Sequence, residues 1–395
     1  MPLGETHLVN SHSHAASLQL RVLRHIGRLA SALVFALAAC RSRPPQATPV
    51  RDDLVSTGRE WRATGGIAVA RDRLSAALIK LDADGGSLER RVLRTNADKT
   101  LRLPDSLASL PPGQRGRTGI FLVLGYHTRA GRSEPVIQHV ESYLRSEGWR
   151  AVLVPVPIHG TPDENAVAIQ KMLAQNLPHL RRAIVVGFSK GGLDWMHWFV
   201  GHARELPEAE RKKIQLMVNF AGALRGAAVA SWMTEADGLL PAVLRARLRL
   251  HTARALSAVK STAVDPWSNG QLPTLAAEFP QLRSVSIVAV PEGTDGQTHA
   301  DPIFSRLGRH ATRQWQWLGP VDGLVETAGQ VLPVEARVPQ HVVRTFGSHA
   351  VLDGRYANGA AVSKIYRKRE ADYWQGGEEL LDDLIRALPR DWVWR

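Results

Sequence analysis

Apolar and polar residues alternate along the chain in blocks that predict buried strands separated by helices. Apolar residues recur at helical spacing in 135–146 and 162–177, and again in 378–388 near the end of the chain. Runs that are apolar throughout are typical of strands buried on both faces. Strands that alternate with helices indicate an α/β fold with a mainly parallel central sheet flanked by helices. The six expected strands lie at 119–124, 150–156, 183–186, 214–220, 285–290 and 342–346.

The third of these strands leads into Gly187-Phe188-Ser189-Lys190-Gly191, which fits the pattern G-x-S-x-G. After a strand and before a helix, this pattern predicts a sharp turn with the serine at its apex. The flanking glycines allow a backbone conformation that larger side chains would obstruct. Such a turn presents the Ser189 hydroxyl at the carboxyl edge of the sheet, so Ser189 is a candidate nucleophile. The alternative interpretation is a glycine-rich turn with an ordinary N-cap serine.

The first 39 residues have the pattern of a secretion signal. Three arginines precede an apolar run over 29–39, which is too short to span a bilayer comfortably. The run ends in Leu37-Ala38-Ala39-Cys40, which resembles the lipobox of bacterial lipoproteins. That resemblance implies cleavage before Cys40, a lipid on its thiol and, because Arg41 follows, an outer-membrane location. Cys40 is the single cysteine of the chain, so no internal disulfide can form. A soluble secreted protein with a leftover cysteine is the alternative.

Beyond the signal, changes in pattern indicate how the chain is divided. Residues 40–60 are polar and proline-rich, which predicts an extended tether that carries the lipid. A small N-terminal extension is expected over 61–118, ahead of an α/β domain over 119–395. Within that domain, a basic amphipathic helical insertion interrupts the strands over 227–280. This insertion predicts either a solvated helix face or a cap over the active site that meets anionic lipid.

The net charge of +13 bears on partners more than on the fold. It predicts attraction to anionic surfaces such as phospholipid headgroups or lipopolysaccharide. Nucleic acid is not an expected partner, because the sequence has neither zinc-finger ligands nor an RNA-binding motif nor an evident recognition helix. We expect no metal and no cofactor, since the chain contains no His-Glu-x-x-His, no P-loop and no G-x-G-x-x-G after a strand.

A serine hydroxyl becomes a nucleophile beside a histidine base, which a carboxylate in turn orients. After a turn of this kind, the acid and then the histidine follow in chain order. His349 comes directly after the last predicted strand, where a loop can bring its imidazole to Ser189. Asp295, Asp301 and Asp322 all lie between the last two strands, and their positions alone leave the choice of acid open.

These features resemble the α/β-hydrolase superfamily, and within it bacterial lipases and esterases, over residues 119–350. In those lipases the acid lies in an Asp-Gly-Leu-Val segment. Asp322-Gly323-Leu324-Val325 matches that segment residue for residue. The resemblance, together with a shorter separation from His349, favours Asp322 over Asp295 as the third member of a Ser189, Asp322, His349 triad.

Acyl transfer also needs backbone N–H donors for the oxyanion. The first is the amide of Lys190, directly after the nucleophile. The resemblance implies that the second comes from the loop after the first strand, where Gly125-Tyr126-His127 stands in place of the usual His-Gly, and we assign it to Tyr126. The Lys190 side chain is interpreted either as a surface lysine or as a group that favours an anionic substrate.

The sequence therefore predicts a membrane-anchored serine hydrolase that cleaves small-molecule or lipid carboxylic esters. An amidase, a thioesterase or an acyltransferase with the same triad remains open. A protein of another class, a lipoprotein that keeps the fold but only binds a ligand in the cleft, is the alternative to an enzyme.

Overall fold

The computed structural model describes residues 54–125, 134–157, 159–235, 257–260, 272–290, 318–322, 324–346 and 377–394. Several predictions fall outside these ranges: the signal and Cys40, Tyr126, the basic helix of the insertion, Asp295, Asp301 and His349. The domain boundaries, the lipid anchor and the cap also stay predictions. Within the described residues, no helix combines the length and the apolar character that a membrane crossing requires.

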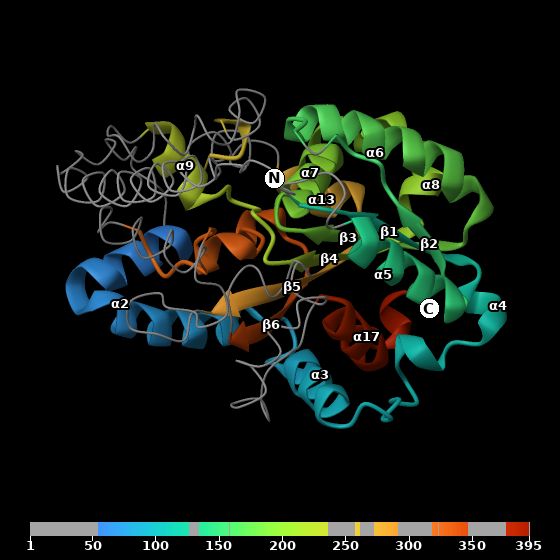
Figure 1. Cartoon of the computed structure of the whole chain (residues 1–395), viewed down its shortest axis with the longest axis horizontal. Helices are drawn as coiled ribbons and strands as arrows, with labels where there is room; N and C mark the ends of the chain where they lie inside the picture. Colours follow the sequence, from blue (N-terminus) through green and yellow to red (C-terminus); the bar gives the residue numbers. More distant parts are fainter. Residues whose placement is uncertain are drawn as a thin grey trace, which may run out of the picture.

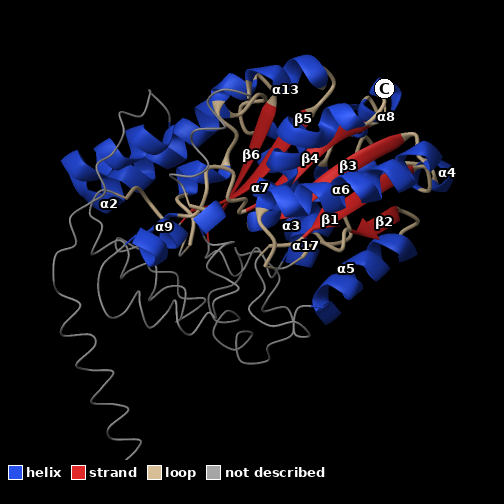
Figure 2. Ribbon diagram, turned by 90° about the horizontal axis from the view of Figure 1, so that it is seen from above, coloured by secondary structure: helices blue, strands red, loops and turns tan. Residues whose placement is uncertain are grey.

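All six predicted strands are present and form one sheet in the order β2-β1-β3-β4-β5-β6. Every neighbouring pair is parallel, and Figure 2 shows the strands side by side with β2 and β6 at the edges. The strands are β1 (Thr118–Val123), β2 (Arg150–Leu153), β3 (Arg182–Phe188), β4 (Ile214–Phe220), β5 (Arg283–Val290) and β6 (Gln340–Phe346). The carboxyl ends of all six strands therefore meet at one edge of the sheet.

Helices cover both faces of this sheet, as expected for parallel strands whose two faces are apolar. Helices α6, α7, α8 and α13 lie over one face, and α3, α5 and α17 lie over the other (Figure 1). Each layer closes a separate hydrophobic core against the strands. Their bounds are α3 (Ser87–Ala97), α5 (Glu134–Ser146), α6 (Pro162–Asn176), α7 (Lys190–His197), α8 (Glu208–Arg211), α13 (Pro273–Glu278) and α17 (Gly377–Ala387); α4 (Pro112–Arg115) and α9 (Ala228–Glu235) lie in connections. The fold class predicted from the sequence, a parallel α/β sheet flanked by helices, is confirmed.

The N-terminal segment differs from the sequence prediction in two places. Helix α2 (Leu54–Leu81) begins inside the segment assigned to the extended tether, so residues 54–60 are helical and the tether as predicted ends too late. The cause is tertiary: Val55, in the part of α2 before a break at Gly66, is buried in a cluster with residues of β5 and β6, which Leu74 and Leu78 of the second part also join. The sequence pattern after Asp84-Gly85-Gly86 predicts a short strand-like piece, and this prediction is wrong: residues 87–97 form helix α3, whose Leu88 belongs to the main core.

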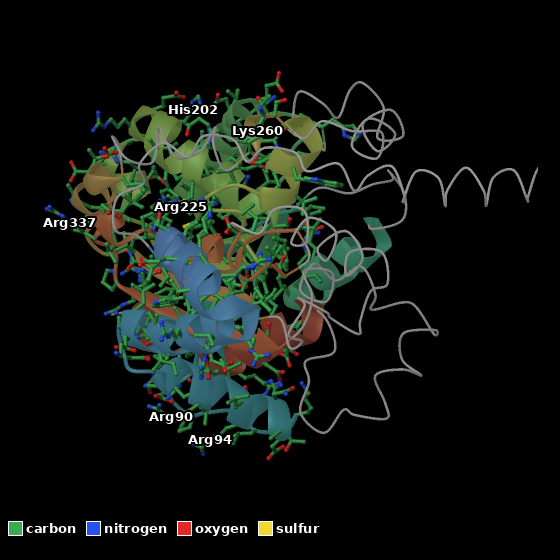
Figure 3. The ribbon with its side chains drawn as sticks, turned by 90° about the vertical axis from the view of Figure 1, so that its left-hand side faces the viewer. Arg90, Arg94, His202, Arg225, Lys260 and Arg337 are labelled. Carbon is green, nitrogen blue, oxygen red and sulfur yellow. The ribbon has the colours of Figure 1, made fainter. Side chains whose placement is uncertain are left out.

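Positive charge is spread over the described surface. Arg90 and Arg94 project from α3 at one end of the molecule, whereas Lys260 lies toward the other end (Figure 3). The predicted attraction to anionic surfaces stays a prediction, because the basic helix on which it most depends lies outside the described residues.

Candidate active site

Ser189 lies in the sharp turn that joins β3 to α7. Its backbone angles are φ 54° and ψ −121°, a combination that non-glycine residues rarely adopt and that must be held by its surroundings. Three backbone hydrogen bonds hold it here. The Ser189 N–H donates to the Phe220 carbonyl at the end of β4 (2.9 Å), and the Ser189 carbonyl accepts from the amides of Gly192 (3.1 Å) and Ala223 (3.0 Å).

The glycines of the motif are explained by close backbone approaches. A Cβ on Gly187 would lie 2.6 Å from the Gly192 nitrogen, and a Cβ on Gly191 would lie 2.3 Å from the Val123 carbonyl oxygen. Both contacts are with backbone, which cannot move aside as a flexible side chain could. Small residues at these two positions therefore let α7 begin directly against the ends of β1 and β3, with Ser189 at the bend.

The chain that leaves β1 passes over the serine side chain. A Cβ on Gly125 would lie 2.6 Å from the Ser189 Cβ and 3.1 Å from its Oγ. The first amides of α7 lie on the other side of the turn, and the initial N–H groups of a helix lack partners within the helix. Ser189 is thus in close contact with Gly125 on one side and is followed directly by the Lys190 amide, the first of α7.

The Lys190 side chain turns inward. It is 2% exposed, and its Nζ donates to both carboxylate oxygens of Asp194, at 2.7 and 2.9 Å. Asn165 of α6 donates to the same carboxylate (2.7 Å). The interpretation of Lys190 as a surface lysine is therefore wrong, and its charge is engaged by Asp194 instead of being presented to a substrate. Burial raises the pKa of Asp194 to about 6, although the charge and hydrogen bonds of Lys190 oppose that rise.

Asp322 lies in a tight turn with both carboxylate oxygens bonded. Its side chain is fully buried. Oδ1 accepts the amides of Leu324 and Val325, both at 2.9 Å, and Oδ2 accepts the side-chain amide of Gln330 at 2.8 Å. A carboxylate with three donors is held in a single orientation, which is what a group that must orient a histidine requires.

Gln330 also connects the Asp322 turn to the end of β5, although the two lie far apart along the chain. Its Oε1 accepts the amide of Ala289, near the carboxyl end of β5, at 2.8 Å. Thr327 donates its hydroxyl to the Ala289 carbonyl (3.0 Å). The 3₁₀ turn Thr327–Gln330 is thus fastened to the end of β5 and places Asp322 at the same edge of the sheet as Ser189.

The two candidate residues are further linked through the loop after β4. That loop donates from Ala223 to the Ser189 carbonyl and from Arg225 to the Gly329 carbonyl (3.1 Å). Leu193 of α7, Ala223 and Val325 also share one buried cluster. The structure therefore brings the regions of Ser189 and Asp322 together, whereas Tyr126, Asp295 and His349 lie outside the described residues.

The strand order and the strained serine turn between a central strand and its helix decide the fold family. This is the α/β-hydrolase fold. No model of a known protein family and no curated protein matches the chain.

Solved structures similar to this one include carboxyl esterases and lipases. A metagenomic carboxyl esterase, MGS0156, is 15% identical, with a TM-score of 0.46 over 70% of this chain and 76% of that chain. The mature lipase BlEst2 of Bacillus licheniformis is 12% identical, with a TM-score of 0.43 over 64% of this chain and 91% of its own. Carboxyl esterase 2 of Tuber melanosporum is 13% identical, with a TM-score of 0.37 over 73% and 86% of the two chains. At these identities the likeness concerns the fold and not the substrate.

Gln330 and Thr327 are the residues of the site that the sequence reasoning missed. A glutamine and a threonine in a mixed loop carry no local signal, since their partners lie some 40 residues earlier in β5. The burial of Lys190 had a weak signal, because Lys190 and Asp194 are spaced i,i+4 on a predicted helix.

Proposed function

We propose that this protein is a serine hydrolase that cleaves carboxylic esters through an acyl-enzyme on Ser189. The observation that carries the proposal is the strained backbone of Ser189 (φ 54°). Strained backbone conformations of non-glycine residues cluster at active sites, and this one occurs at the serine of a G-x-S-x-G turn that three glycines with close backbone or Ser189 contacts surround.

The proposed reaction follows from the roles that the surroundings allow. The Ser189 oxygen attacks the acyl carbonyl while His349 takes its proton, and Asp322 holds the imidazole in the required tautomer. The amides of Lys190 and Tyr126 donate to the oxyanion. His349 then protonates the leaving alcohol, and water, activated by the same histidine, releases the acid and restores the serine.

Chain connectivity supports His349 as the base. Strand β6 ends at Phe346 and pairs along its whole length with β5, whose carboxyl end holds the Asp322 loop. Three residues span at most about 10 Å. A histidine three residues after β6 is thus within reach of the edge of the sheet that Ser189 and Asp322 share, and we propose His349 for this role.

The predicted signal and Cys40 extend the proposal to an enzyme fixed to the cell envelope, at the outer membrane, by a lipid on that cysteine. A hydrolase held at a bilayer meets lipid esters at high local concentration, so we include lipid esters among the proposed substrates. Labelling with a radioactive fatty acid tests the anchor, and Cys40→Ala should abolish the label.

The decisive experiment uses Ser189→Ala and a fluorophosphonate probe with p-nitrophenyl esters as substrates. The wild-type protein should be labelled and active, whereas the variant should show neither property. Full ester hydrolysis by Ser189→Ala would overturn the proposal, and an unlabelled, inactive wild type would favour a ligand-binding lipoprotein.

Two further variants identify the acid. Asp322→Asn should lower kcat by about 10⁴-fold if the histidine loses its correct tautomer, while Asp295→Asn should leave kcat almost unchanged. The reverse result would assign the acid to Asp295.

A further inference from the structure

A group of three potential ligands lies at the edge of the sheet opposite the candidate active site. Asp82 and Asp84 belong to the turn between α2 and α3, and His341 is the second residue of β6. One ligand atom from each lies within 4.8 Å of the others. A backbone hydrogen bond from Ala83 to the Gln340 carbonyl (2.8 Å) holds the turn against the start of the strand.

His341 is the member of this group that the fold does not explain. Its side chain is 2% exposed, and neither ring nitrogen has a hydrogen-bond partner. Buried polar atoms normally have such partners, and each exception calls for an explanation. The ring stacks on Trp392 with 3.9 Å between centroids, which fixes its plane, and its Nδ1 lies 3.4 Å from Asp84 Oδ2.

The two carboxylates are already placed by the backbone. Asp82 accepts the amides of Asp84 (2.8 Å), Gly86 (3.2 Å) and Val342 (2.7 Å). Asp84 accepts the amide of Ser87 through Oδ1 (2.8 Å) and that of Leu88 through Oδ2 (3.2 Å), and Oδ2 also lies near His341 Nδ1. Backbone hydrogen bonds thus hold both carboxylates close to His341, so folding brings the three potential ligands together.

We propose that Asp82, Asp84 and His341 bind a divalent d-block cation and that the group fits Zn²⁺. Zinc takes nitrogen and carboxylate ligands at about 2.0–2.2 Å in a tetrahedron, whose edges are then about 3.4 Å long. The separation of His341 Nδ1 and Asp84 Oδ2, 3.4 Å, equals that edge. Calcium and magnesium prefer ligand sets made of oxygen alone, so the buried imidazole selects against them.

The remaining geometry suits a site with one open position. The Asp84 side chain is 25% exposed whereas His341 is 2% exposed, so an ion can enter on the Asp84 side and keep a water molecule there. Bound zinc would join the α2–α3 turn to β6. Because His341 stands at the amino end of its strand and Ser189 follows the carboxyl end of another, the ion would stabilise the fold and take no part in ester cleavage.

The test measures zinc in the full chain, purified without a histidine tag and without chelators. Metal analysis and calorimetric titration with Zn²⁺ should show one more equivalent bound by the wild type than by Asp84→Asn. Asparagine retains an oxygen that can accept the Ser87 amide at the start of α3 but lacks the charge, so this variant should fold and should bind Zn²⁺ at least tenfold more weakly. His341→Phe keeps a ring to stack on Trp392 and should lose the site altogether.

A chelator provides the second readout. It should lower the melting temperature of the wild type but not that of His341→Phe, and Zn²⁺ should restore it. His202→Gln is the matched control, because His202 also contacts one carboxylate, that of Glu205 at 2.8 Å, and it should bind zinc as the wild type does. Equal zinc binding by wild type and both site variants would overturn the proposal, as would tenfold tighter binding of Ca²⁺ or Mg²⁺ than of Zn²⁺.

Discussion

Replacing Gln330 with methionine should weaken both the fold and the reaction, because one side chain holds both Ala289 and Asp322. The side chain of Gln330 is fully buried, and methionine has a similar length without either hydrogen-bonding group. The substitution removes a bond to a carboxylate, worth about 1.5–3 kcal/mol, and leaves the buried Ala289 amide unpaired at a cost of about 1–3 kcal/mol. We therefore expect the free energy of unfolding to fall by about 3–5 kcal/mol.

The effect on catalysis is smaller but more informative. If the bond from Gln330 orients Asp322, losing its 1.5–3 kcal/mol in the transition state should lower kcat by about 10–100-fold. KM should change little, because the acid does not contact the substrate. The assay is p-nitrophenyl ester hydrolysis at a temperature at which urea titration shows that the variant remains folded.

Gln340→Met is the matched control for this experiment. Gln340 is also buried, but its amide donates to the Leu332 carbonyl (3.0 Å) and does not reach the Asp322 loop. It should lose stability and keep its kcat. If Gln330→Met also kept its kcat while losing stability, Asp322 would not be the acid; if it lost no stability, the bridge between Ala289 and Asp322 would be wrong.

Three further predictions concern stability. Arg59→Gln should lower the free energy of unfolding by about 2 kcal/mol in urea titration, because it removes the cation that is hydrogen-bonded to the Glu326 carboxylate, whose side chain is 6% exposed. Gly191→Ala should cost more than about 2 kcal/mol and at least 100-fold in ester turnover, since its Cβ would meet a backbone oxygen of β1 at 2.3 Å. The third prediction concerns pH. Burial raises the pKa of Asp194 to about 6 from 3.8, so the folded state favours the protonated acid. The contribution of Asp194 to stability is therefore complete below pH 3.8 and is lost as the pH rises through 6. That loss is about 3 kcal/mol, and a Lys190→Met, Asp194→Asn double variant should lack it in urea titrations at pH 4 and pH 7.

A specific experimental result would refute each of these three predictions. Gly201→Ala is the control for the glycine, because a Cβ at that position would have no atom within 4 Å, and equal losses in both variants would refute the steric argument. Stability that is unchanged in Arg59→Gln would show that the ion pair contributes nothing measurable. If the double variant showed the same change in the free energy of unfolding between pH 4 and pH 7 as the wild type, other titrating groups would cause that change.

The sheet could be predicted well because each strand is recognisable from a short local run. Strands β1, β3 and β5 are buried almost throughout, so their apolar runs are long and can be recognised without knowledge of the partner strand. Helix α3 escaped detection for the opposite reason. Its segment, Ser87–Ala97, is mostly polar, and only Leu88, Val92 and Thr95 are buried. Three buried positions among eleven residues give too weak a periodicity, and the packing of α3 against α17 and β6 decides its structure.

The candidate site also combines features that adjacent residues determine with features that depend on residues far away in the chain. Five adjacent residues determine the bend at Ser189, and the structure has the expected turn. The Asp322 turn is also local, because its Oδ1 bonds the second and third residues after it. The connection of that turn to β5 is not local, since it depends on Gln330 and Thr327 finding Ala289. Pattern reasoning can thus propose the members of the site but not the residues that hold them in place.

The start of α2 shows how far such distant causes reach. Arg59 donates to the Glu326 carboxylate, and Glu326 in turn accepts the amide of Gly319 (2.8 Å). Arg62 donates to the Leu318 carbonyl (2.5 Å). Both ends of the turn that contains Asp322 are therefore bonded to the start of α2, which lies partly inside the segment predicted as a tether. A polar, proline-rich segment offered no reason to expect order at 54–60, yet hydrogen bonds to residues more than 250 positions away hold this part of the helix in place. The same bonds make the N-terminal helix part of the support of Asp322, so a change at the start of α2 should also affect the position of the proposed acid.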